Sequence, residues 1–110
     1  MKEHNLGEFE EIVLLAVGVL KGEGYGVSIK KEIETRGERS VSVGALQSSL
    51  IRLEEKGYIK TAEGEKTQER AGRPKKYYQI TAYGQSALEY KKSVRTRFWE
   101  AMPNIQLKIQ

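Results

Sequence analysis

Three helical patterns in succession, then two short strand patterns and one long helical pattern, leave few folds open to this chain of 110 residues. In residues 7–24, apolar side chains recur every three or four positions, as they do on one face of a helix. These side chains are Phe9, Ile12, Val13, Ala16, Val19 and Leu20. Leu15 and Val17 widen the stripe, so we expect a helix that is buried on more than one side. Gly22 and Gly24 follow it and end it.

Two further helices are expected before the strands. Residues 25–37 form the first, with the apolar residues Val27, Ile29 and Ile33. Residues 41–57 form the second, and either Ser40 or Ser42 can cap its start, because a serine hydroxyl accepts a hydrogen bond from a free amide of the first turn. Its apolar stripe consists of Val43, Leu46, Leu50 and Leu53. Gly57 ends it.

The opposite face of this third helix is unusual for a surface that meets only water. Its N-terminal half carries small and amide side chains where glutamate and lysine would be common. The residues of this face are Gly44, Gln47, Ser48, Ile51 and Glu55, with Arg52 at the edge. Small side chains allow a close approach and polar ones can hydrogen-bond, so we expect this face to contact a partner.

A β-hairpin with a basic loop comes next. Residues 58–64 and 76–81 alternate as strands do, and the loop 63–74 joins them. Residues 70–76 carry four positive charges and no negative charge. Loops of this length commonly carry function or are disordered. The return strand begins with Tyr77 and Tyr78. The alternation sends one of these rings to the core and the other outward, without deciding which.

The last segment is a helix of about twenty residues, roughly 30 Å long, with Thr81 as its predicted N-cap and Pro103 at its end. Its apolar face consists of Tyr83, Ala87, Tyr90, Val94 and Phe98, extended by Leu88, Trp99 and Met102. So small a body cannot cover such a stripe, so we expect it to pack against a second copy of the chain.

This order of elements predicts a mainly α fold with a small β-hairpin, a winged helix-turn-helix with a long C-terminal dimerisation helix. We divide the chain into a DNA-binding domain (6–81), the dimerisation helix (82–103) and a loosely ordered tail (104–110). In this fold the third helix enters the DNA major groove. The hairpin, which serves as the wing, lies against the phosphate backbone or in the minor groove.

The predicted DNA-binding residues come from the third helix and the wing. They are Ser42, Gln47, Ser48, Arg52, Arg70, Arg73, Lys75 and Lys76. Gln47 suits adenine, Arg52 suits guanine or phosphate, and Ser48 suits either kind of base edge. Ser42 can bond a phosphate at the start of the helix. The basic residues of the wing supply phosphate contacts, which give affinity and salt dependence.

Several of these residues also have a purely structural interpretation. In that interpretation Ser42 serves only as a helix cap, Arg52 serves only as the ion-pair partner of Glu55, and Arg70 is an ordinary loop residue. The predicted dimer interface or effector site consists of Phe9, Tyr90, Val94, Phe98, Trp99 and Met102. For Phe98 and Trp99, a dimer core and a platform for a ligand are the two alternatives.

Charge and composition support a polyanionic partner and exclude other classes. The net charge is +4, and basic residues gather in 70–76 and 91–97. The chain has no cysteine and a single histidine, His4, so we expect a cytoplasmic protein without metal or cofactor. No apolar run reaches the roughly 18 residues of a membrane span. Without a nucleophile beside a base or clustered carboxylates, we expect no enzyme.

Three stretches in this order resemble the PadR family of bacterial transcriptional regulators: GEFEEIVLLAVGVLKGEGYGVSIKKEIE, SVGALQSSLIRLEEKGYI and GRPKKYYQITAYG. The resemblance runs from about Leu6 to Ala87 and extends into the long last helix. It implies a homodimer that represses transcription from a palindromic operator, with small aromatic molecules as effectors. Many members have Tyr-Pro where this chain has Gln47 and Ser48, so we expect a different operator. A winged-helix adaptor that binds proteins is the alternative.

Overall fold

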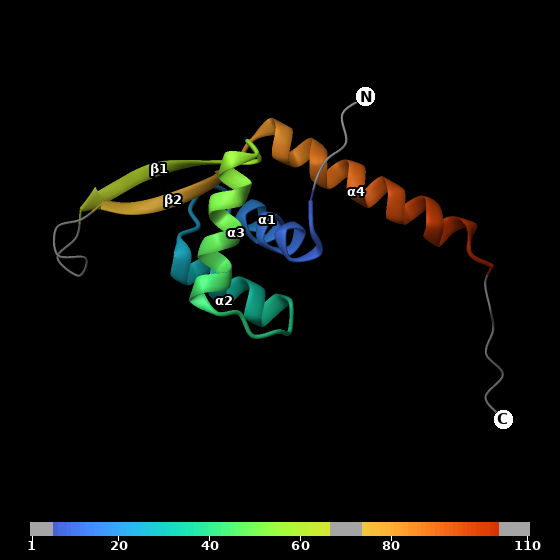
Figure 1. Cartoon of the computed structure of the whole chain (residues 1–110), viewed down its shortest axis with the longest axis horizontal. Helices are drawn as coiled ribbons and strands as arrows, with labels where there is room; N and C mark the ends of the chain where they lie inside the picture. The colour runs from blue at the N-terminus through green and yellow to red at the C-terminus, as the bar shows by residue number, and fades with distance from the viewer. Residues whose placement is uncertain (1–5, 67–73, 104–110) are drawn as a thin grey trace.

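The computed structural model describes residues 6–66 and 74–103. Its elements are α1 (Glu8–Val19), α2 (Gly26–Arg36), α3 (Val43–Glu55), β1 (Ile59–Lys66), β2 (Pro74–Ile80) and α4 (Ala82–Ala101). The first three helices form one body, and the hairpin and α4 leave it in opposite directions (Figure 1). The predicted winged helix-turn-helix is therefore confirmed. The dimerising role of α4 and the domain boundaries stay predictions.

The core lies between α1, α2 and α3 and extends to the base of the hairpin. Its fully buried large side chains are Val13, Leu14, Val17, Ile29, Ile33, Leu46, Leu50, Leu53 and Tyr58. The buried face of α1 differs from the predicted stripe, because it includes Leu14 and leaves Val19 exposed. In α3, Val43 is exposed and Ser49 takes a core position instead. Val43 opens the first turn, at the rim of the body, which explains its exposure.

The hairpin has longer strands than the sequence predicted. Ile59 lies opposite Ile80 and Glu63 opposite Lys76, and after an irregular step Lys66 lies opposite Pro74. The predicted loop 63–74 is therefore too long. The predicted first strand ended at Gly64, but Gly64 lies inside β1. A Cβ atom there would come within 2.3 Å of the Tyr77 ring.

The two adjacent tyrosines of β2 take different faces, which resolves the alternative left open by the sequence. Tyr78 is buried in the core, and its backbone N–H donates to Gly24 O at 2.8 Å. Tyr77 lies on the other face, edge-on to Tyr25, with 6.2 Å between the ring centroids. The base of the hairpin is thus attached to the connection between α1 and α2.

Thr81 caps α4, as predicted, and fixes the direction in which this helix leaves the body. Its hydroxyl oxygen accepts from the Gly84 N–H at 3.0 Å, and the hydroxyl donates to Gly57 O at 2.7 Å. A Cβ atom at Gly84 would lie 2.2 Å from the carbonyl oxygen of Tyr58, so only glycine fits this contact. Beyond Ala87 no residue of α4 is buried, and the helix projects from the body.

Candidate nucleic-acid interface

The start of α3 is held by two side-chain caps. Ser42 Oγ accepts from the Ala45 N–H at 3.1 Å, so Ser42, rather than the alternative Ser40, is the N-cap. One residue earlier, the carboxylate of Glu34 accepts from the Val41 N–H at 3.1 Å. The hydrogen bond from Lys30, followed by the one from Val41, lowers the pKa of Glu34. An ionised Glu34 therefore anchors the connection through which α2 presents α3.

The outward face of α3 is open to solvent, as the pattern predicted. Its residues Gly44, Gln47, Ser48, Ile51 and Glu55 are all exposed. No atom lies within 4 Å of the place where a Cβ atom of Gly44 would stand, so packing within the chain does not require glycine there. Gln47 lies next to the start of α2, because its Nε2 is 3.6 Å from the Cβ position of Gly26.

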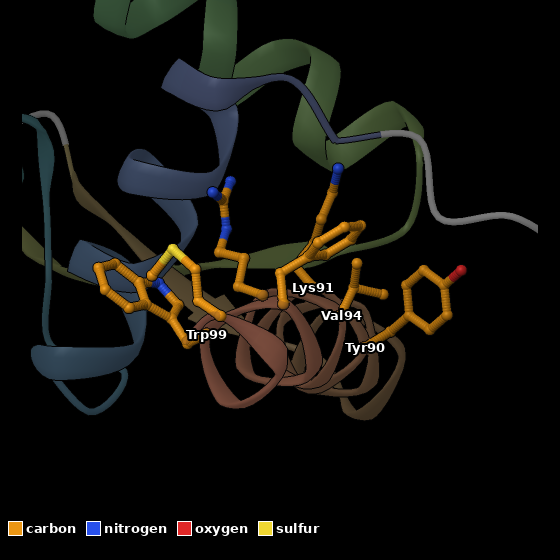
Figure 2. Close-up of a pocket in the computed structure, with 7 residues that line it drawn as sticks. Tyr90, Lys91, Val94 and Trp99 are labelled. Atoms are coloured by element: carbon orange, nitrogen blue, oxygen red, sulfur yellow. The ribbon is translucent and has the colours of Figure 1, made fainter. Parts of the chain in front are cut away.

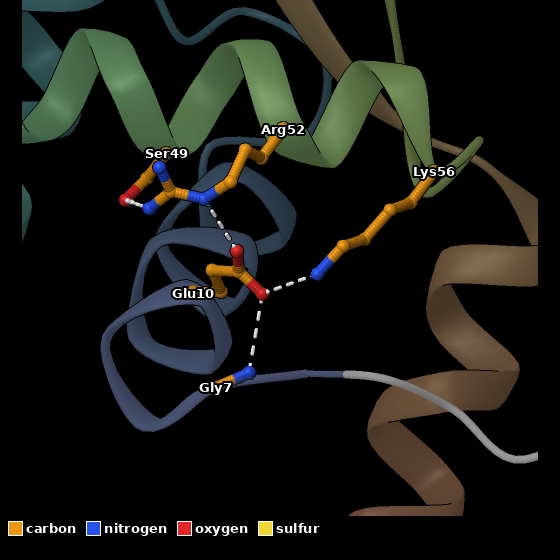
Figure 3. Close-up of polar contacts among 5 residues, drawn as sticks. All are labelled: Gly7, Glu10, Ser49, Arg52 and Lys56. Atoms are coloured by element: carbon orange, nitrogen blue, oxygen red, sulfur yellow. Dashed lines mark hydrogen bonds and ion pairs between the residues drawn. The ribbon is translucent and has the colours of Figure 1, made fainter.

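Arg52 is bound to a carboxylate that the sequence analysis missed. Arg52 Nε donates to Glu10 Oε2 at 2.8 Å, and Lys56 Nζ donates to Glu10 Oε1, also at 2.8 Å. The N–H of Gly7 donates to the same carboxylate at 3.1 Å. Figure 3 shows Arg52 from α3 and Lys56, which follows the end of α3, both reaching toward Glu10 of α1. The predicted pairing of Arg52 with Glu55 is therefore wrong, because Arg52 pairs with Glu10.

Glu10 stays ionised although it is buried. Burial alone would raise its pKa, but the hydrogen bonds from Lys56, Arg52 and Gly7 lower that pKa to about 2. Its position could have been read from the sequence, because it precedes Val13 and Leu14 at the spacing of one helical face. An acid on an apolar face requires basic partners.

The wing begins beside Gln47 and α2. Lys75 Nζ lies 4.2 Å from the centre of the Tyr25 ring, a cation–π contact, and Lys76 on the next position of β2 is exposed. Tyr25 directly precedes Gly26, next to which Gln47 lies, so the exposed face of α3 and Lys75 of the wing flank the same turn. The predicted DNA contacts Arg70 and Arg73 lie outside the described residues.

The apolar face of α4 forms a second candidate site, an open hollow of about 740 Å³. It is lined by Tyr90, Lys91, Val94, Arg95, Phe98, Trp99 and Met102. Figure 2 looks along α4, with Tyr90 and Trp99 spread to either side of Val94. Five of the six predicted interface residues thus come together. Phe9 does not join them, since it packs against the core under Arg39, 5.1 Å from its ring centre.

Residues 6–66 and 74–103 contain neither a metal-binding cluster nor a membrane span. No three His, Cys, Asp or Glu side chains of this part gather where they could hold a metal ion. None of its helices is both long enough and apolar enough to cross a membrane.

Known proteins resemble this chain in sequence and in fold. The model of the transcriptional regulator PadR-like family matches residues 14–90. A transcriptional regulator from Clostridium thermocellum is 28% identical, with 83% of this chain and 82% of that chain covered and a TM-score of 0.67. A PadR-like transcription factor from Bacteroides fragilis is 27% identical, with 84% of each chain covered and a TM-score of 0.69. A PadR family transcription regulator from hypervirulent Clostridium difficile is 31% identical, with 83% and 93% covered and a TM-score of 0.62. No curated protein matches the chain.

Proposed function

Because the chain belongs to the transcriptional regulator PadR-like family, we propose that this DNA-binding regulator is a repressor that binds a palindromic operator as a dimer. The resemblance found in the sequence is confirmed by the family match over residues 14–90. The proposal concerns the finer points: repression, operator symmetry, the dimer, its effector and the residues in contact with DNA. It also includes a cytoplasmic location, where a bacterial operator lies, and no catalytic activity.

The observation that carries the proposal is the exposed outward face of α3 next to Lys75 and Lys76 at the start of β2. Gln47 and Ser48 offer hydrogen bonds to base edges, and Ser42 and its neighbouring amides suit a phosphate. Lys75 and Lys76 bind phosphates on the flank, joined by Arg70 and Arg73. Arg52 keeps a phosphate role only, because Glu10 holds its guanidinium toward α1.

A dimer built on α4 is supported by the exposed aromatic end of that helix. Phe98 is 74% exposed and Trp99 is 70% exposed. Adjacent large apolar side chains with this much exposure are typical of a surface that binds a partner. Pairing two copies through this face would hold the two α3 helices at half-sites about 34–36 Å apart. A small aromatic effector that enters the hollow beside Trp99 would change the angle between the copies and weaken operator binding.

A gel shift with the DNA upstream of the protein's own gene tests the proposal. We expect binding at low salt that weakens steeply as salt is raised, and protection of two symmetric half-sites. Absence of duplex binding at low salt would contradict it. Binding to an acidic protein without binding to DNA would favour the adaptor alternative instead.

A further inference from the structure

We propose that α3 recognises thymine through Ile51, whose methyl groups pack against the C5-methyl of thymine in the major groove, beside an adenine bound by Gln47. This inference rests on the proposed function and specifies the bases of each half-site. It assigns to Ile51, a residue of the face expected to contact a partner, a role in choosing the operator.

The single arginine of α3 is held toward α1, and the helix contains no lysine. All residues of α3 are described, and Arg52 is its single basic residue. Its Nε is bound to Glu10 at 2.8 Å and a terminal nitrogen faces Ser49 Oγ at 3.4 Å (Figure 3). The commonest specific contact to guanine is a bidentate arginine or lysine. The outward face of α3 is therefore poorly equipped to select G·C pairs.

The same face offers what an A·T pair displays. The amide of Gln47 matches the N6 and N7 atoms of adenine. Ile51 stands one helical turn further along, is 54% exposed, and is the large apolar side chain at the centre of this face. In the major groove, the apolar group available to such a side chain is the thymine methyl. Contact between the Ile51 side chain and the thymine methyl would remove both apolar groups from water.

The two ends of α3 differ in how deeply they can enter the major groove. Glu54 and Glu55 are the last two residues of α3, and DNA phosphates would repel their carboxylates. The N-terminal end carries the free backbone amides and Gly44, so it suits the phosphates better. The N-terminal and central turns therefore lie deepest. Gln47 and Ile51 are four positions apart, about 6 Å along the helix. Base pairs are about 3.4 Å apart, so the adenine and the thymine should lie within about two base pairs.

The test replaces thymine by deoxyuridine, which removes only the methyl group. Duplexes bound by the wild-type protein are selected from a random pool, and the best one is made with thymine or with deoxyuridine in its half-sites. We expect an adenine and a thymine within two pairs of each other in each half-site. Each contacted methyl that is removed should weaken binding about fourfold. Deoxyuridine outside the half-sites serves as the control and should change nothing.

Variants then assign the methyl effect to Ile51. The Ile51→Ala protein should bind the thymine duplex more weakly and should no longer distinguish it from the deoxyuridine duplex. Val27→Ala, which truncates an exposed apolar side chain on α2, should keep the full discrimination. Because Ile51 is exposed, its truncation should leave the melting temperature nearly unchanged.

The outcomes separate this inference from the proposed function. If no duplex is enriched at low salt, DNA binding itself fails. If duplexes are enriched but the wild-type protein binds thymine and deoxyuridine half-sites equally, the role of Ile51 is overturned while DNA binding stands. The role is equally overturned if Ile51→Ala keeps the wild-type discrimination. The wild-type comparison decides the matter even where a variant fails to fold.

Discussion

Arg52 on α3 and Glu10 on α1 are joined by an ion pair of 2.8 Å, although 42 positions of sequence separate them. The next residue of α1, Glu11, pairs with Arg95 of α4 at 3.0 Å. Adjacent acids at the start of α1 therefore hold the helix proposed to read DNA and the helix proposed to pair the two copies. The same turn of α1 thus contacts both α3 and α4.

Replacing Glu10 with glutamine should destabilise the fold by about 2–3 kcal/mol, because it leaves two basic groups without their buried carboxylate. Urea unfolding at neutral pH measures the change. Glu8→Gln is the matched control, because Glu8 also lies in the first turn and pairs with Arg39, but its side chain is 73% exposed. Its effect should stay below about 0.5 kcal/mol. Equal effects of the two substitutions would contradict the buried role of Glu10.

The lowered pKa of Glu10 predicts how stability depends on pH. A carboxyl group with a folded pKa of about 2, against an ordinary 4.5, stabilises the fold fully above its ordinary pKa. That contribution should be lost as the pH falls from about 4.5 toward about 2, at most about 3 kcal/mol. Urea unfolding of wild type and Glu10→Gln at several pH values measures it. Their difference should shrink across this window, and a constant difference would contradict the pKa assignment.

The sequence predicted the order of elements, the caps and the exposed face of α3, because local spacing determines these features. Ser42, Gly57 and Thr81 each carry their own chemical signal for a helix end. The sequence could not predict the partner of Arg52, because Glu10 is a neighbour only after α1 and α3 have packed together. The choice between Tyr77 and Tyr78 also needed tertiary structure, since alternation marks two faces without saying which one meets the core.

Replacing Gly44 with alanine should make the protein more stable and a weaker DNA binder. Alanine favours a helix over glycine by up to about 1 kcal/mol, and nothing in the chain obstructs the added methyl group. If the first turn approaches DNA closely, the methyl group should weaken binding by about three- to tenfold, the loss of roughly one hydrogen bond. Thermal unfolding and a gel shift measure the two effects.

Gly18→Ala provides the control for this prediction. Gly18 lies in the last turn of α1, one residue before the helix ends at Val19, and an added Cβ atom would meet only Ile80, at an ordinary 4.0 Å. This variant should also gain stability but should bind DNA as the wild type does. Unchanged DNA binding by Gly44→Ala would show that α3 keeps its distance from the duplex at this turn.

Two substitutions at the wing separate charge from position. Lys75→Gln should weaken binding to all DNA sequences and lower the slope of affinity against salt by about one unit. Tyr25→Leu removes the ring on which Lys75 rests but keeps the charge. It should weaken binding by about threefold, as an exposed cation–π contact implies, while the salt slope stays unchanged. Titrations at four salt concentrations measure both quantities.

Lys31→Gln is the control for the wing, because Lys31 is exposed on the face of α2 opposite the buried Ile29 and Ile33. Its salt slope should equal that of the wild type. If Lys31→Gln lowered the slope as much as Lys75→Gln does, net charge rather than contact by the wing would govern binding.

Removing the exposed aromatic end of α4 should separate the two copies. Phe98 and Trp99 are the large apolar side chains that the body leaves most exposed on α4, so a partner copy would gain most by covering them. The double substitution Phe98→Ala and Trp99→Ala should weaken the dimer by at least about 3 kcal/mol, more than a hundredfold in Kd. Sedimentation velocity over a range of concentrations measures it. Glu100→Ala, on the opposite side of α4, should leave the dimer intact.

The same double variant should also bind operator DNA more weakly, because two unlinked α3 helices no longer reach both half-sites as one unit. A single half-site, by contrast, should be bound as well as by the wild type, since α3 and the wing are untouched. If the double variant sediments as the wild type does, the aromatic end of α4 is not the interface. The spacing of the two α3 helices would then have to be set by another surface, such as the exposed Leu15 and Val19 of α1.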